Sequence, residues 1–451
     1  MFEFIIAITI IVATIFLIYK KYDIKAVMFA AGLLMMLAAI GLGHEILDSE
    51  VSSGLAIFDM FRVVGDSFTD QLGGASFIIM LLFGYTTYMK EIGANETTVR
   101  LLSAPLIRLK YKGFLIPAFF LMGNLLCVFI PSASSLAVLL MSTAYPILVK
   151  AGVSPLAVGA VIATSATIAP TPLGIDNVLA SNALSMSLAE YTFHYHARVS
   201  IPIILILAVV HYGWQQWCDR REEIIPNSKI INLSADLVAN CPKIYAILPM
   251  LPLVLVVVFT LFFEQVEVGI IEITLFSFVV AIICESIRLG SCSKASEKIE
   301  LFFKGMSNGF TMVVVQVVAA LTFVGGLRSL GIIDAISQMI NGVNGGGILT
   351  TLALCSLVLL VGILSGSGLA LFFAFVELIP DFAAAAQINP LLLAIPMQFT
   401  AHFVKSISPL APTVVITSSM MGVTPLKLIK RTIVPSVVGI ALSIILSYVF
   451  F

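Results

Sequence analysis

Long apolar runs, separated by short polar loops, make up most of this chain. We predict a membrane crossing, which takes about 20 predominantly apolar residues, at each of ten runs. These are residues 2–19, 26–42, 72–89, 155–188, 198–216, 244–263, 268–288, 306–327, 389–422 and 434–451. No basic leader or small-residue cleavage site precedes the first run, so we expect it to remain as a span. The pattern predicts an all-α, polytopic membrane protein.

Two other apolar stretches, 113–150 and 346–383, are interrupted near the middle by small polar residues. The interruptions are Pro131-Ser132-Ala133-Ser134-Ser135 and Ser365-Gly366-Ser367-Gly368. In each stretch one arm, 136–149 or 370–379, is too short to span. Irregular backbone at membrane depth is tolerated only where it is buried in protein or lines a cavity. We therefore predict two re-entrant helical hairpins with their tips near the midplane.

The composition supports a membrane protein and excludes several other classes. Hydrophobic residues make up 60% of the chain and charged residues 11%, whereas soluble domains carry about 25% charged residues. The net charge of −1 leaves no general attraction for nucleic acid. The six cysteines are scattered, without CxxC or Cys/His spacing. We predict no metal site, no disulfide framework and no cofactor.

Basic loops alternate with acidic ones along the chain. Lysine and arginine gather after the first and third runs, in 217–243, in 288–304 and in 427–431, whereas 45–70 and 264–267 are acidic. Basic loops of a membrane protein lie on the cytoplasmic side. With ten crossings, one orientation satisfies all these loops and places both termini outside the cytoplasm.

The two halves of the chain show matching landmarks. Ser134 is followed by Pro146 and Pro155, as Ser367 is followed by Pro380 and Pro390. We predict two repeats, 1–217 and 244–451, joined by a cytoplasmic linker at 218–243. Each repeat has five crossings and one hairpin, and an odd number makes the repeats run in opposite directions. Inverted repeats with broken helices are typical of secondary transporters.

The two predicted tips are the first candidate site. Helix N-termini after such breaks present amide N–H groups and the positive end of the helix dipole, so two facing tips would suit an anion with two carboxylates. The candidates are Ser132, Ser134, Ser135, Ser365, Gly366, Ser367 and Gly368. The alternative is that these small residues only let helices pack closely.

The crossings after the hairpins are the second candidate site, because each is broken by a pair of prolines. Pro170 and Pro172 break the first, and Pro409 and Pro412 the second. The polar candidates around them are Thr167, Thr171, Asp176, Asn177, Lys405, Ser406, Ser408 and Thr413. A charge at membrane depth faces a partner or a cavity, so Lys405 pairs either with a substrate or with Asp176. We expect His402 to be structural.

Several short motifs are spread along the chain in a specific order. They are Gly93-Ala94-Asn95, Ser365 to Gly368, Phe375-Val376-Glu377 with Ile379-Pro380, Ile395-Pro396-Met397, Ser408-Pro409, and Lys430-Arg431-Thr432 with Pro435. With these motifs the chain resembles, over nearly its whole length, the anaerobic C4-dicarboxylate carriers of the DcuC type, including the DcuD-like members. Three features depart from the family. Lys405 stands where an Arg is expected, Leu369 follows Gly368 in place of Asn, and sodium-site motifs are absent.

The resemblance implies a transporter of the ion transporter superfamily in the bacterial inner membrane. Such carriers import, export or exchange fumarate, succinate, malate or aspartate. It also implies a homodimer with an elevator-like mechanism, in which the hairpins move with 155–188 and 389–422. The spans 26–42, 198–216, 268–288 and 434–451 would then contribute to a static scaffold.

Three other functions remain open from the residues. The chain could carry another small organic anion or an amino acid. Ser367 and His402 could form the dyad of an intramembrane serine protease, although a protease has no use for a second matching tip. A channel is the third alternative, but the sequence offers no rings of one charge sign.

Overall fold

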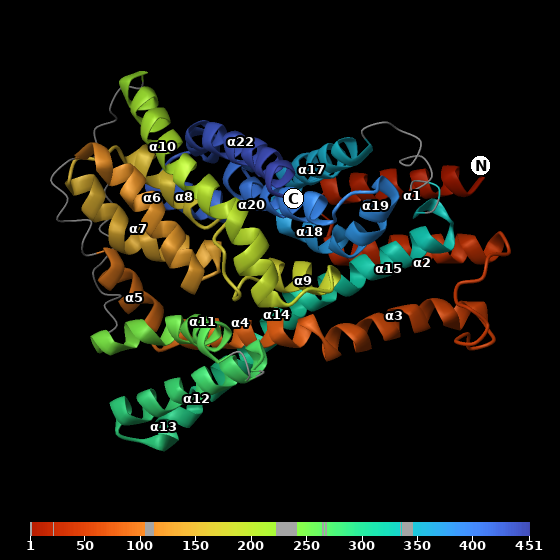
Figure 1. The fold of residues 1–451 in the computed structure, drawn as a ribbon, viewed down its shortest axis with the longest axis horizontal. Coiled ribbons are helices and arrows are strands. Elements are labelled where there is room, and N and C mark those ends of the chain that lie inside the picture. The colour runs from red at the N-terminus through yellow and green to blue at the C-terminus, as the bar shows by residue number, and fades with distance from the viewer. Residues whose placement is uncertain are drawn as a thin grey trace.

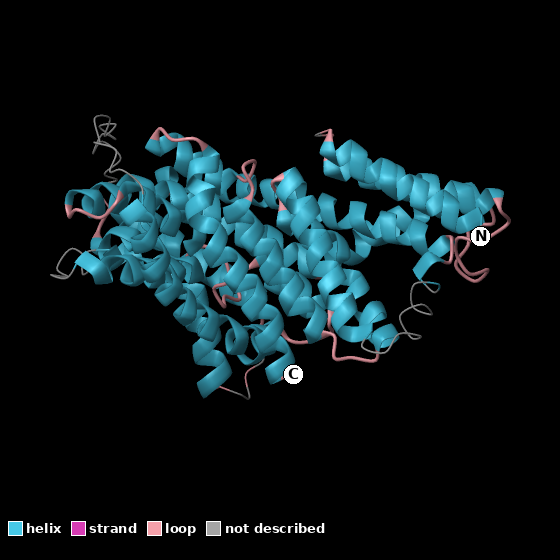
Figure 2. Cartoon of the chain, turned by 90° about the horizontal axis from the view of Figure 1, so that it is seen from above, coloured by secondary structure: helices cyan, strands magenta, loops and turns pink. Residues whose placement is uncertain are grey.

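The computed structural model describes residues 2–451 except 21, 104–111, 222–240, 264–265, 267, 334 and 336–345. The described residues form helices joined by loops, with no strand among them (Figures 1 and 2). The all-α prediction is therefore confirmed. Most of the predicted linker 218–243 lies outside the described residues.

The first half contains ten labelled helices. They are α1 (Phe2–Tyr19), α2 (Ile24–Gly41), α3 (Ala56–Gly73), α4 (Ala75–Glu91), α5 (Ala94–Ser103), α6 (Lys112–Phe129), α7 (Ala133–Lys150), α8 (Pro155–Ser165), α9 (Ile175–Ala183) and α10 (Ala197–Arg221). A π-helical turn, Glu190–His196, leads into α10.

The second half repeats the order of long helices, hairpin and broken helices. Its helices are α11 (Leu251–Phe262), α12 (Ile270–Leu289), α13 (Cys292–Glu297), α14 (Ile299–Gly309), α15 (Val315–Ser329), α17 (Gly346–Ser365), α18 (Gly368–Phe375), α19 (Ile379–Ala386), α20 (Leu391–Ile407), α21 (Pro412–Met421) and α22 (Pro425–Phe450). A 3₁₀ turn, Lys243–Met250, precedes α11. By length and composition, 8 helices of the described residues can cross a membrane, or up to 9 if the bent α3–α4 pair is one span. The count of ten crossings and the opposite directions of the repeats stay predictions.

The broken crossings appear where the prolines predict them. The first is divided between α8 and α9, and the second between α20 and α21. Pro172 lies in the first break and Pro412 opens α21, because proline lacks an N–H donor and is tolerated in the first turn of a helix.

Two details of the sequence interpretation are wrong. The segment expected as an acidic loop contains the 18-residue helix α3, which meets α4 at a 56° bend. The acidic residues made this segment look like a loop. In the structure Asp66 and Asp70 lie on the exposed side of the helix, where charged residues are compatible with helical structure. The arm expected at 136–149 is the 18-residue helix α7, so it is not short. Whether the hairpins re-enter or cross stays a prediction.

The helices pack in two groups. The first, which we call the frame, consists of α1 to α4, α11, α12, α14 and α15. In it α2 packs on α15, and α4 packs on α14 and α12. The α2–α15 contact is close: a Cβ at Gly32 would lie 2.4 Å from the carbonyl oxygen of Thr322. Small residues allow such close packing between membrane helices.

The second group, which we call the core, consists of α6 to α10 and α17 to α22. In it α6 and α7 pack on α8 as α17 and α18 pack on α20, and α10 packs on α22. The spans 198–216 and 434–451 were expected in the scaffold. As α10 and α22 they pack on α6, α8 and α20, which groups them with the hairpins by packing. Contacts do not test which helices move, so the scaffold assignment stays a prediction.

Candidate functional site

Both hairpin tips line one cavity of about 540 Å³. Residues 131–135 of the first tip and 366–369 of the second contribute to its wall. Asp176 from α9, His402 and Lys405 from α20, and Thr413 from α21 complete the side formed by the core. The tips that the sequence predicted to approach each other therefore border the same space.

The first tip ends α6 at Phe129 and begins α7 at Ala133. Ser132 is the N-cap of α7, and its hydroxyl oxygen accepts a hydrogen bond from the Ser135 amide at 3.4 Å. Serine favours this position because its oxygen satisfies an amide that has no partner within the helix. The N-terminus of α7 is thereby fixed at the cavity wall.

The second tip uses the same cap with different neighbours. Ser367 is the N-cap of α18 and accepts a hydrogen bond from the Ala370 amide at 3.4 Å. Gly366 has a φ of 81°, and a Cβ on Gly368 would lie 2.3 Å from the carbonyl oxygen of Ala401. The equivalent caps are thus Ser132 and Ser367, so the proposed match of Ser134 with Ser367 is two residues out of register.

Lys405 reaches Asp176 through a histidine. Its Nζ lies 2.8 Å from Nδ1 of His402, and Nε2 of His402 lies 2.7 Å from Oδ2 of Asp176. Asp176 also accepts a hydrogen bond from the Gln398 amide, which donates a second one to Oδ1 of Asn177 at 2.7 Å. Three charged or polar groups at the cavity wall therefore form one chain.

Six predicted site residues do not line the cavity. Thr171, Ser406 and Ser408 donate to the carbonyls of Val128, Phe403 and Ile363, and Thr167 to that of Thr164. Asn177 donates to the Thr171 carbonyl at 2.8 Å. These side chains tie together the backbone around the breaks, where helical hydrogen bonds end. Ser365 also lies outside this cavity and lines a neighbouring one.

Sequence reasoning missed His402 as a site residue and did not consider Gln398 or Tyr191. The Tyr191 hydroxyl donates to Oε1 of Gln398 at 2.5 Å. Residues 398, 402 and 405 are four and three positions apart, which places them on one face of a helix. That spacing is the signal that could have indicated a shared network.

The cavity wall on the frame side adds further charges. Lys90 and Glu91 end α4, and Lys304 lies in α14. Together with the core, three lysines and two carboxylates line the cavity. No cluster of three His, Cys, Asp or Glu that could hold a metal ion is found within the described part of the chain.

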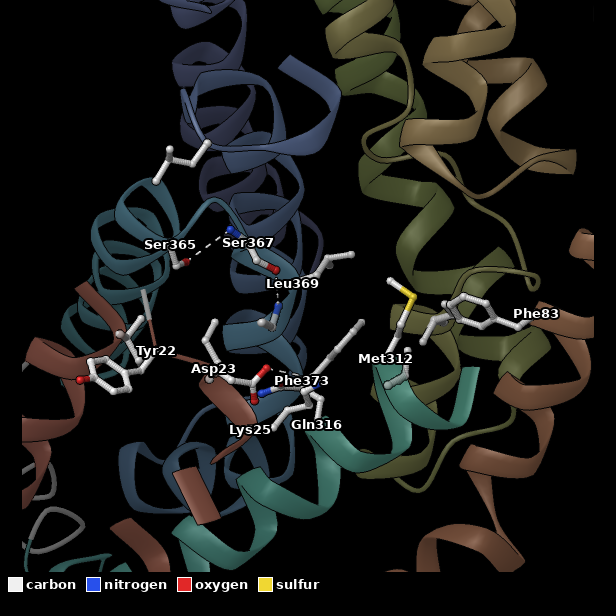
Figure 3. A pocket seen from close by; sticks show the side chains of 16 residues that line it. Tyr22, Asp23, Lys25, Phe83, Met312, Gln316, Ser365, Ser367, Leu369 and Phe373 are labelled. Atoms are coloured by element: carbon white, nitrogen blue, oxygen red, sulfur yellow. Dashed lines mark hydrogen bonds and ion pairs between the residues drawn. The ribbon is translucent and has the colours of Figure 1, made fainter. Parts of the chain in front are cut away.

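A second cavity of about 690 Å³ lies beside the second tip (Figure 3). Ser365 and Ser367 line it from the tip, and Tyr22, Asp23 and Lys25 from the start of α2. Five residues line both cavities: Phe83, Ile175, Met312, Ser367 and Leu369. The second tip thus stands between two neighbouring spaces.

Comparison with known proteins places this architecture in a family. The family described as "C4-dicarboxylate anaerobic carrier" (DcuC) matches residues 2–451. The chain belongs to the DcuC family. The anaerobic C4-dicarboxylate transporter DcuC of Escherichia coli K12 is 33% identical over 98% of this chain and 95% of its own length. A probable DcuC of Vibrio cholerae is 34% identical over 99% and 97%.

Solved structures of other transporters share the fold. Neisseria gonorrhoeae MtrF, described within a class of antimetabolite efflux pumps, superposes with a TM-score of 0.64 at 12% identity, covering 95% of both chains. Alcanivorax borkumensis YdaH gives 0.64 at 14%, covering 94% of this chain and 98% of that one. The resemblance to the DcuC family is confirmed, and this DcuC-family chain is an integral membrane transporter. The DcuC relatives are transporters and not enzymes, which rejects the protease alternative.

Proposed function

We propose that this chain carries C4-dicarboxylates such as fumarate, succinate, malate and aspartate across the bacterial inner membrane, by uptake, efflux or exchange. The observation that carries the proposal is the shared cavity, where both helix N-termini and the Lys405 ammonium meet. Members of the same family are named C4-dicarboxylate transporters. A dicarboxylate has two anionic ends, and the two tips offer two places for them.

In this proposal Lys405 supplies the full positive charge and the tips supply partial charges. Helix N-termini carry only about half a charge each, so they cannot alone balance a dianion. Charge-assisted hydrogen bonds from an ammonium to a carboxylate are stronger than those between neutral groups. Ser134 and the capped first turns of α7 and α18 would hold the carboxylate that does not reach Lys405.

We also propose an elevator-like motion of the hairpin-bearing core against the frame in a homodimer with both termini in the periplasm. The close α2–α15 contact supports a rigid frame. Lys90 and Lys304, which line the cavity, belong to segments that the charge pattern assigns to the cytoplasmic side. The cavity would then open toward the cytoplasm in this conformation.

Lys405→Ala is expected to abolish succinate binding and uptake, whereas Lys405→Arg keeps part of both because it keeps the charge. Purified variants of equal thermal stability would be compared by succinate binding and by uptake into proteoliposomes. Competition by fumarate, malate, aspartate and a monocarboxylate separates a dicarboxylate carrier from a carrier of other small anions.

Two results would overturn the assignment of Lys405. One is succinate binding by Lys405→Ala that is as tight as that of the parent. The other is recovery of stability when Asp176→Asn is added to a destabilised Lys405→Ala, with binding unchanged. Together they would make the chain of Lys405, His402 and Asp176 a structural bridge without a ligand.

A further inference from the structure

We propose that His402 is the positioning residue for the substrate-binding ammonium of Lys405, with Asp176 fixing the histidine ring. This inference rests on the proposed function, because it assigns Lys405 to the substrate. The carboxylate of Asp176 and the ammonium of Lys405 are joined through the imidazole, with no direct ion pair between these two described residues. A direct pair would hold the ammonium against α9 and away from a ligand.

The donors and acceptors around His402 determine which ring nitrogen carries the proton. A lysine ammonium has three donors and no acceptor, so Nδ1 of His402 accepts from Lys405 across 2.8 Å. The proton of the neutral ring then sits on Nε2, which donates to Asp176 across 2.7 Å. In a doubly protonated ring, the N–H at Nδ1 would face the Lys405 ammonium, and two donors cannot form a hydrogen bond with each other. The network therefore selects one neutral tautomer.

Asp176 is itself held in place by a second donor, Gln398. Gln398 donates to Asp176 and to Asn177, and the Tyr191 hydroxyl donates to Gln398. The side chains of His402 and Asp176 are only 9% and 11% exposed. A carboxylate with two donors and little exposure has few alternative orientations, so it is a firm support for the ring.

Other ionisable groups lie near the ring, but none of those in the described residues is hydrogen-bonded to it apart from Lys405 and Asp176. His196 and Tyr191, which belong to the π-helical turn before α10, lie near Asp176, and Cys127 of α6 lies near Lys405. His196 packs edge-on against Phe399, with ring centroids 4.7 Å apart. His402 is the residue that is hydrogen-bonded to both Lys405 and Asp176.

Loss of the ring should redirect Lys405. Without His402, Asp176 keeps its charge and loses a donor, and the flexible lysine stem can bend toward it. The Lys405 ammonium would then pair with Asp176 for part of the time. It would be less available to a substrate carboxylate, which weakens binding of a dicarboxylate. A side chain that offers one acceptor and one donor should restore the bridge.

The test compares His402→Leu with His402→Gln. The Gln amide supplies an acceptor for Lys405 and a donor for Asp176 but cannot titrate, whereas Leu supplies neither. Succinate affinity should fall by about tenfold or more in His402→Leu, since hydrogen bonds to charged groups are the stronger ones, and stay within about threefold of the parent in His402→Gln.

His211→Leu is the matched control, because His211 is also buried and hydrogen-bonded, to Thr164 at 3.0 Å, but does not line the cavity. It should lower thermal stability and leave the succinate affinity of the folded protein unchanged. If His402→Leu fails to fold because Asp176 loses its partner, the double variant with Asp176→Asn removes that charge. The double variant should fold and keep a succinate affinity near that of the parent, because no carboxylate at position 176 remains to attract Lys405.

Three results would overturn the proposal. Parent-like succinate affinity in folded His402→Leu, or weak binding by the folded double variant, would show that the ring does not act by keeping Lys405 away from Asp176. Equal loss in folded His402→Gln and His402→Leu would show that proton exchange by the ring matters and the bridge does not. A parent protein that binds no dicarboxylate would instead contradict the proposed function, so the two failures are distinguishable.

Discussion

The two hairpin tips place equivalent serine caps in unlike surroundings. At the first tip, Ser132 precedes Ala133, and all five residues from 131 to 135 are half-buried. At the second, Ser367 stands between two buried glycines, Gly366 and Gly368. Gly366 lies against the backbone of Leu410 and Gly368 against that of Ala401, so a Cβ on either would come within 3 Å.

The difference shows that only the second tip is tightly fixed to the helix that carries Lys405. Ala401 and Lys405 both belong to α20, one turn apart. The second tip should therefore keep its distance to Lys405 in every state. The first tip has no glycine contact with α20, so its distance to Lys405 is not fixed in this way. Three sets of substitutions test this contrast.

The largest effect is expected for Gly368→Ala, which gives the second tip the residue that the first has at Ala133. The new Cβ would lie 2.3 Å from the Ala401 carbonyl oxygen, and overpacking of this kind costs about 1–3 kcal/mol. We expect a lower melting temperature and loss of succinate uptake. The control is Ala133→Gly, which should change uptake little. Normal uptake by Gly368→Ala would show that the second tip is not fixed to α20.

Removal of the caps should have an intermediate effect. Ser132→Ala and Ser367→Ala should each cost about 1 kcal/mol of stability, as for other N-caps. Thermal unfolding of the two purified variants measures this. If the second tip is held mainly by its glycine contacts, Ser367→Ala will lose less stability than Ser132→Ala. The reverse order would contradict the contrast between the tips.

The smallest effect is expected for Ser134→Ala. Ser134 lines the cavity, and no hydrogen bond from its hydroxyl to another described residue is found. Loss of one neutral hydrogen bond to the ligand should weaken succinate binding by about fivefold, with thermal stability unchanged. Isothermal titration with succinate and fumarate would show this. Unchanged affinity would remove Ser134 from the proposed site.

Much of the architecture could be predicted from local signals in the sequence. The breaks after α8 and α20 were predicted because each proline removes a helical hydrogen bond and crowds the preceding turn, and two prolines close together interrupt the apolar run. Helix α3 was missed because its aspartates suggested an acidic loop, and the helical spacing of its apolar residues was not considered. The register of the tips was misjudged because proline distances do not identify which serine caps a helix.

The site was harder to predict than the fold. Asp176 and His402 are separated by 226 positions, and nothing local to either residue indicates the partner. Lys405 and Asp176 were recognised as unusual charges, but a direct pair seemed the only protein alternative to a substrate. The hydrogen bonds that Gln398 and His402 of α20 make to Asp176 of α9 are visible only in three dimensions, and they reveal the histidine between the two charges.

The chain of Lys405, neutral His402 and Asp176 has an electrical consequence. One positive and one negative charge cancel, so this part of the core adds no net charge when it is empty. If the core moves across the membrane with a dianion, the charge displaced is that of its cargo. Moving one charge through 100 mV involves about 2.3 kcal/mol. An interior-negative voltage would therefore push the loaded core outward, and inward transport would require cations to travel with the cargo or a second dianion to return.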